Sequence, residues 1–232
     1  DEAIQYVQHH YASNYGSINQ QLLFSINFND TTKWFTNFLE SRFEKFGKYE
    51  DAIVTEASVL HHSVLTPMLN IGLINPKDIV SDSIEFGLAN NIPLNSLEGF
   101  VRQLIGWREF IRIVYEKEGT KQRTTNYWGF SRKIPASFWK GTTGILPIDI
   151  TIKKVLATGY CHHIERLMYL STWMLMNRIH PKEVYRIFME WTIDAYEWVM
   201  IPNVFGMGQF ATDNMMTRPY FCSSNYILKM SN

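Results

Sequence analysis

The clearest pattern of apolar and polar positions lies between residues 96 and 118. Its apolar members recur at the spacing of one helix face, so we expect a helix over residues 96–118. Gln103 and Trp107 stand four positions apart and therefore share a face of this helix. Three arginines make the helix locally basic, and a solvated face is the usual place for such charges. The apolar members are Leu97, Phe100, Val101, Leu104 and Ile105, and the arginines are Arg102, Arg108 and Arg112.

Two apolar runs, at residues 167–176 and 184–193, predict a second pair of helices over residues 162–176 and 182–199. Pro181 fits the first position of the later helix, where its missing N–H does no harm. If the two helices are antiparallel, Arg166 comes close to Asp194. A buried arginine needs such a carboxylate partner. The alternative is an ordinary structural ion pair, because ion-pair networks also shape protein cores.

The rest of the chain also indicates helices. Residues 1–48 suggest helices, with a cap at Asp30 to Thr32, and residues 79–88 and 150–158 predict two more. Residues 119–144 and the stretch after Gly208 look irregular. No strand pattern, internal repeat or linker is visible. We therefore expect an all-α fold in which residues 1–232 form a single helical domain.

A short stretch before Pro67 is a candidate anion site. Residues 49–66 lack periodicity and contain the sequence HHSVLT at positions 61–66. Hydroxyl side chains and backbone N–H groups at a helix start bind phosphate well. The alternative is that Thr66 is a plain helix cap.

Composition narrows the function classes. Hydrophobic residues make up 46% and charged residues 19% of the 232 positions, as in a globular protein with a full core. The formal net charge is zero, so nucleic-acid binding would depend on a local patch. Cys161 and Cys222 form no Cys-x-x-Cys pair, and no apolar run reaches transmembrane length. The chain starts with Asp1, so we expect a processed or partial protein, and an organellar location after removal of a targeting segment stays open.

Six segments, in order, carry a family resemblance. They are FGKYEDA (46–52), HSVLTPMLNIGLINP (62–76), EGFVRQLIGWREF (98–110), YCHHIERLM (160–168), DAYEWV (194–199) and PNVFGMGQF (202–210). Together they resemble the C-terminal, FAD-binding helical domain of the photolyase/cryptochrome family. The branch they resemble most is that of the iron–sulfur bacterial photolyases associated with (6-4) photoproducts.

The resemblance implies a role for each matching position. Tyr49 and the run His62, Ser63, Val64, Leu65 and Thr66 would hold the FAD pyrophosphate and ribityl chain. Gln103 and Trp107 would line the pocket near the adenine and the lesion, and Arg166 with Asp194 would flank the isoalloxazine. Tyr196, Met200 and Asn203 would complete the cofactor site, with Met200 facing flavin N5. His162 and His163 would be the catalytic residues, since imidazole titrates near neutrality.

The chain also departs from this branch. The antenna domain and the cysteine ligands of the cluster are absent, and Cys161 and Cys222 are not at ligand positions. We therefore expect FAD as the cofactor, no iron–sulfur cluster and no other metal. Met200 replaces a polar or acidic residue, and a thioether exchanges no proton with N5. Ile187 and Phe188 stand where the branch places redox-active aromatic residues.

Three functions remain open. The first is light-driven repair of pyrimidine photoproducts in damaged DNA, with a lesion flipped from the duplex. The second is a cryptochrome-like photoreceptor. The third is a non-repairing structural or accessory subunit packed against other proteins. An absorption spectrum separates a flavoprotein from the third function. Phosphate contacts in the first would come from Arg102, Arg108, Arg112, Lys121 and Arg123.

Overall fold

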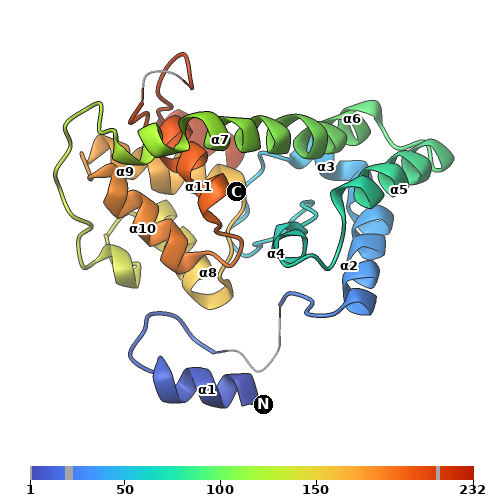
Figure 1. The fold of residues 1–232 in the computed structure, drawn as a ribbon, viewed down its shortest axis with the longest axis horizontal. Coiled ribbons are helices and arrows are strands. Elements are labelled where there is room, and N and C mark those ends of the chain that lie inside the picture. The colour runs from blue at the N-terminus through green and yellow to red at the C-terminus, as the bar shows by residue number, and fades with distance from the viewer. Residues whose placement is uncertain (1, 19–22, 213–214) are drawn as a thin grey trace.

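The computed structural model describes residues 2–18, 23–212 and 215–232, and helices dominate it (Figure 1). Among these residues the only β-type pairings are isolated bridges, which confirms the all-α class. The elements are α1 (Glu2–His10), α2 (Phe28–Ser41), α3 (Phe43–Tyr49), α4 (Thr66–Asn70), α5 (Pro76–Ala89), α6 (Leu94–Arg102), η1 (Gln103–Trp107), α7 (Arg108–Thr124), η2 (Phe138–Lys140), α8 (Leu146–Thr158), η3 (Glu165–Ser171), α9 (Thr172–Met176), α10 (Pro181–Trp191), α11 (Glu197–Ile201), η4 (Pro202–Gly208) and α12 (Ser224–Met230).

Helices α2 to α6 surround one hydrophobic cluster. Its centre is a group of phenylalanines, in which the Phe38 ring lies tilted at 4.9 Å from the Phe100 ring and 5.4 Å from the Phe43 ring, measured between ring centres. Gly47 lets α3 approach the start of α6, because a Cβ there would lie 2.5 Å from the Asn95 carbonyl oxygen. Only glycine fits at this contact.

Helices α8 to α11 with η3 and η4 surround a second cluster. Its fully buried members include Ile152, Leu170, Met174 and Ile187. Pro181 begins α10 as expected, and the His180 side chain accepts a hydrogen bond from the backbone N–H of Lys182. Helix α1 buries no residue and lies at the edge of the molecule (Figure 1).

One long helical rod joins the two groups. It consists of α6, η1 and α7, and in Figure 1 it runs along one side of the molecule. One end packs on α3 and α5, and the other packs on α11 and η4. The helix predicted over residues 96–118 is therefore confirmed but longer. The prediction of irregular structure from residue 119 is wrong for residues 119–124, which belong to α7. Gly119 lies inside this helix against the Tyr115 ring.

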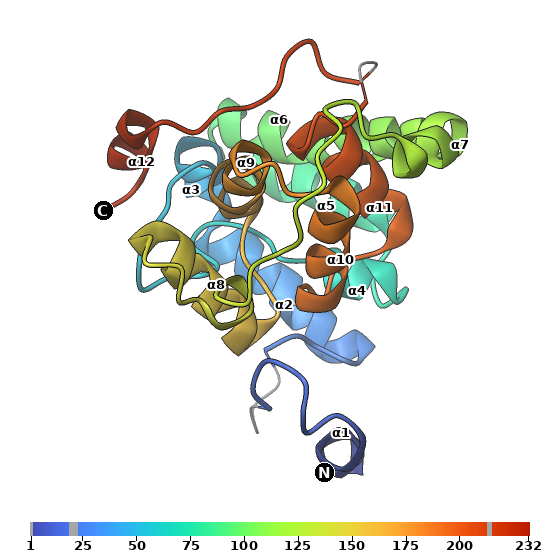
Figure 2. The same ribbon diagram turned by 90° about the vertical axis from the view of Figure 1, so that its left-hand side faces the viewer.

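Three other expectations need correction. The helix predicted over residues 182–199 is interrupted, because Thr192 is extended and the N–H of Ile193 donates to the Gly159 carbonyl instead. The stretch after Gly208 contains α12 (Figure 2). At the end of this helix the Met230 carbonyl accepts a hydrogen bond from the N–H of Ile53. The cap of α2 is Asn27, whose side chain accepts from the N–H of Asp30.

Candidate functional site

A pocket opens where the two groups of helices meet. It has a volume of about 210 Å³, and Leu65 and Phe100 on its wall belong to the first cluster, while Trp107 and Val199 pack against the second. Residues predicted for the cofactor site contribute much of the wall, and the pocket brings them together from the loop before α4 and from η1. These residues are Ser63, Leu65, Thr66, Gln103 and Trp107.

The loop before α4 is held in place from α2. The Trp34 indole N–H donates to the Ser63 carbonyl at 2.7 Å, and Arg42 Nη1 donates to the His62 carbonyl at 3.0 Å. Val64 is buried with a φ of 53°, a left-handed conformation that costs a β-branched residue about 1–3 kcal/mol. Such strained backbone concentrates at functional sites.

Thr66 is the first residue of α4 and not its cap, which is Leu65 without a side-chain hydrogen bond. The plain-cap alternative is therefore wrong. Helix α4 has only five residues, so its dipole adds little, and anion binding would depend on the hydroxyl groups of Ser63 and Thr66. That role stays a prediction.

The opposite wall of the pocket is the rod. Gln103 donates a hydrogen bond to Glu50 at 3.1 Å, and Trp107 lies in the same π-helical turn. Arg108 follows, with its guanidinium 4.8 Å from the centre of the Trp198 ring. Burial lowers the pKa of Arg108. This wall offers an amide, two indoles and one cation to a flat ligand.

Arg166 and Asp194 form the ion pair that the sequence predicts, but neither residue lines the pocket wall with Gln103 and Trp107. Arg166 Nη1 donates to Asp194 Oδ1 at 2.8 Å, and Nη2 donates to Oδ2 at 3.0 Å. Their side chains are 15% and 11% exposed. Burial disfavours the charge on Arg166, but Asp194 together with Cys161 and Tyr160 outweighs this effect, so the pKa of Arg166 is raised. Asn70 donates to the Asp194 carbonyl at 3.2 Å, which links the pair to α4 beside the pocket.

The three histidines of the site differ in exposure. His162 is buried and stacks on His62, with ring centres 5.0 Å apart and planes at 15°. His163 is exposed. Burial lowers the pKa of His62 to about 4 and that of His162 to about 3. Both of these rings are therefore neutral at pH 7.

Other predicted site residues lie outside the pocket wall. Tyr49 is 37% exposed and packs on His61, and Tyr196 is 39% exposed. Met200 is buried in the second cluster. The amide of Asn203 donates to the Val199 carbonyl at 2.8 Å, which leaves its buried oxygen without a hydrogen-bond partner among the described residues. The cofactor roles of these residues stay predictions.

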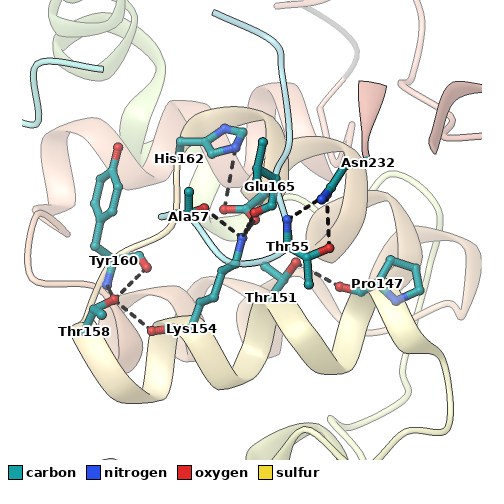
Figure 3. Close-up of polar contacts among 11 residues, drawn as sticks. Thr55, Ala57, Pro147, Thr151, Lys154, Thr158, Tyr160, His162, Glu165 and Asn232 are labelled. Atoms are coloured by element: carbon teal, nitrogen blue, oxygen red, sulfur yellow. Dashed lines mark hydrogen bonds and ion pairs between the residues drawn. The ribbon is translucent and has the colours of Figure 1, made fainter. Parts of the chain in front are cut away.

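Sequence reasoning missed several site residues. Trp198 and Val199 line the pocket, yet only their place in the DAYEWV segment could have suggested it. Lys154 and Glu165 form a buried ion pair at 2.8 Å, with side chains 10% and 1% exposed (Figure 3). Glu165 lies inside the YCHHIERLM segment, but no spacing rule connects it with Lys154.

Three π-helical segments occur among the described residues, and each carries predicted site residues. Gln103 and Trp107 belong to η1, Arg166 to η3 and Asn203 to η4. The π-helix is rare and frequently marks functional sites. No group of histidine, cysteine or acidic residues in the described part of the chain is arranged to hold a metal ion. No described helix is both long and apolar enough to cross a membrane.

Comparison with known proteins gives sequence relatives. No protein-family model matches the chain. A (6-4) photolyase of Agrobacterium fabrum is 35% identical over 231 residues, which cover 99% of this chain and 45% of that protein. The uncharacterised protein R853 of Acanthamoeba polyphaga mimivirus is 38% identical over 112 residues, covering 48% of this chain and 85% of that protein. The chain thus spans about half the length of the photolyase it matches.

Solved structures give the same fold. A cryptochrome from Synechocystis sp. PCC6803 superposes with a TM-score of 0.72 and 17% identity, over 88% of this chain and 44% of that one. A bacterial class III photolyase from Agrobacterium tumefaciens superposes with a TM-score of 0.68 and 19% identity, over 82% and 40%. From its sequence relative and its fold, the chain belongs to the photolyase/cryptochrome family and matches that family's helical FAD-binding domain.

Proposed function

We propose that this chain binds FAD at the pocket between the two groups of helices and serves a light-dependent function of the photolyase/cryptochrome type. The observation that carries this proposal is the convergence of the loop before α4 with η1. Ser63 and Leu65 from the loop and Thr66 at the start of α4 line one pocket with Gln103 and Trp107. These positions belong to two separate segments that resemble the family, residues 62–76 and residues 98–110.

The residues present fit a flavin nucleotide in part. A pocket of about 210 Å³ is smaller than the roughly 300–1,000 Å³ of typical ligand sites, so it would hold one portion of FAD. Hydroxyl groups of Ser63 and Thr66 suit phosphate oxygens, and the Trp107 indole suits stacking. Bound FAD would supply light absorption and one-electron chemistry.

The Arg166–Asp194 pair would give the site a fixed polar edge. Because both side chains are largely buried and bonded in two places, the guanidinium keeps its orientation with or without a ligand. A preorganised cation stabilises negative charge that develops beside it without further rearrangement. An anionic reduced flavin would gain from such a neighbour.

Repair of a (6-4) photoproduct is the finer form of this proposal, because the Agrobacterium fabrum relative is a (6-4) photolyase. His163 would face the DNA lesion as an accessible imidazole. A photoreceptor without repair is the second candidate. Met200 favours it, since this buried thioether exchanges no proton at the position that the resemblance assigns to flavin N5.

Reconstitution with FAD tests the proposal. The purified protein is incubated with excess FAD and desalted, and its absorption spectrum is recorded. We expect retained oxidised-flavin bands, and a colourless protein contradicts flavin binding. Trp107→Ala should weaken FAD affinity, because stacking on an aromatic ring contributes about 1–3 kcal/mol, or roughly 5- to 150-fold. Trp128→Ala is the matched control, since Trp128 is 41% exposed and does not line the pocket.

Blue-light turnover separates the two finer functions. Flavin-loaded protein is illuminated with an oligonucleotide that contains one (6-4) photoproduct, and the restored bases are measured. Repair that depends on light and on His163 supports a photolyase. Flavin photoreduction without any repair supports the photoreceptor.

A further inference from the structure

A second polar cluster is buried between α8, η3 and the loop before α4, apart from the pocket wall. We call it the Lys154 cluster. Its members are Lys154, His162 and Glu165 (Figure 3), together with His62, which stacks on His162. The side chains of His162 and Glu165 are 0% and 1% exposed. Buried polar groups in such positions need partners, so the orientation of each group is constrained by its neighbours.

All three N–H donors of the Lys154 ammonium are engaged in hydrogen bonds. Its ammonium donates to the carbonyls of Val54 at 2.7 Å and Ala57 at 3.0 Å, and to Glu165 Oε1 at 2.8 Å. An ammonium has three donors, and all three are in use. The side chain at position 165 must therefore direct an oxygen at Lys154.

The second oxygen of Glu165 faces His162. Glu165 Oε2 lies 3.7 Å from His162 Nε2, and among the described residues it has no hydrogen-bond partner. Both ring nitrogens of His162 also lack one. Burial raises the pKa of Glu165, but the Lys154 ammonium at 2.8 Å opposes that rise and favours the carboxylate form. A carboxylate oxygen can only accept, so its contact with the facing nitrogen is favourable only when that nitrogen carries a proton.

The surroundings of His162 keep its ring singly protonated. His62 stacks on it from the loop, Lys154 approaches from α8, and His163 and Arg166 lie on its own segment. Burial and these neighbours lower the pKa of His162 to about 3. The neutral ring has one proton to place on one of two nitrogens.

We propose that Glu165, anchored by Lys154, is the positioning residue that sets the tautomer of His162, with the proton on Nε2 and Nδ1 left as an acceptor. His162 is then an acceptor at Nδ1 and not a donor. Its use in the flavin site rests on the function proposed above, but the tautomer itself is a property of the protein without flavin.

Substitution of Glu165 by glutamine gives a directional test. Lys154 still requires an oxygen, so in Glu165→Gln the amide oxygen turns to Lys154 and the NH₂ group faces His162. Nε2 must then accept, and the proton moves to Nδ1. In Lys154→Met/Glu165→Gln the amide is free to turn back, which restores the Nε2–H form. Glu183→Gln is the matched control, because Glu183 pairs with the half-exposed Arg186 at the surface.

Long-range ¹H–¹⁵N correlation spectra of ¹⁵N-histidine-labelled protein without flavin report the tautomer directly, and His162→Asn assigns the signals. We expect Nε2–H in the wild type and in Glu183→Gln, and Nδ1–H in Glu165→Gln. A wild-type His162 that carries its proton on Nδ1, or on both nitrogens at pH 7, overturns the proposal without any variant. A folded Glu165→Gln protein with an unchanged tautomer overturns it too. Failure of FAD binding leaves these spectra unaffected, so the two proposals are tested separately.

Discussion

Removal of the Asp194 carboxylate tests whether the ion pair beside the pocket supports the fold. In Asp194→Ala the Arg166 guanidinium loses both hydrogen bonds, at 2.8 and 3.0 Å, yet its side chain is only 15% exposed. The charge cannot be lost, because arginine stays protonated in proteins. The variant therefore retains a largely buried cation without its counter-ion.

The expected loss of stability depends on the contacts that Arg166 retains in Asp194→Ala. Breaking a buried pair by removing one partner costs about 3–5 kcal/mol. Arg166 Nε still donates to the Cys161 carbonyl at 2.7 Å, and its guanidinium stays 5.4 Å from the centre of the Tyr160 ring. These contacts favour the lower end of the range, about 3 kcal/mol. For a chain of this size, about 2–4 °C per kcal/mol gives a melting temperature lower by roughly 6–12 °C.

Urea and thermal unfolding followed by far-ultraviolet circular dichroism measure the loss. Glu197→Ala is the control, because Glu197 pairs with Arg123 at 3.0 Å while both side chains are about half exposed, and such pairs contribute about 0–1 kcal/mol. Arg166→Met/Asp194→Ala should be no less stable than Asp194→Ala, since it removes the unpaired charge. If Asp194→Ala unfolds like the wild type, or only as much as Glu197→Ala, the buried-pair argument fails.

Two further predictions concern packing and pH. Gly47→Ala should lower stability by about 1–3 kcal/mol, because its Cβ would lie 2.5 Å from backbone atoms of Asn95. Gly106→Ala has no atom within 4 Å of its Cβ and should be neutral or stabilising in the same urea titration. The free energy of unfolding should fall as the pH drops from 6.5 toward 4. In the unfolded chain His62 and His162 become protonated in this range, whereas in the folded chain their pKa values are about 4 and about 3 and both stay neutral. The slope should approach about 2.7 kcal/mol per pH unit for two protons, and a flat profile between pH 7 and 5 contradicts it.

The helices could be predicted because their apolar faces repeat at 3.6 residues, but their interruptions could not. Residues 182–199 have the pattern of one helix, and the chain nevertheless becomes extended at Thr192 to meet the Gly159 carbonyl. That contact joins segments far apart in sequence, so no local sequence pattern predicts it. The interruption places Asp194 in a loop, where its carboxylate reaches Arg166.

The site could be predicted only where a residue's own chemistry requires a partner. A buried arginine demands a carboxylate, so Arg166 and Asp194 were predictable. Glu165 gives no such indication, because a glutamate among helical residues is normally solvated. Its role depends on Lys154, whose ammonium is fixed by two carbonyls of a distant loop. The Lys154 cluster therefore becomes visible only in three dimensions.

Helical irregularity coincides with several of the residues predicted for the site. The π-helical segments η1, η3 and η4 all contain predicted site residues, and the left-handed Val64 lies beside the same pocket. Helices α2, α5, α8 and α10, each of 11 to 14 residues, are regular throughout. An i→i+5 turn and a left-handed valine both cost free energy. Of these features, η1 and Val64 lie at the pocket, because Gln103 and Trp107 line it and Val64 stands between the lining residues Ser63 and Leu65. At these two places we expect the positions of the side chains to matter more than local backbone stability.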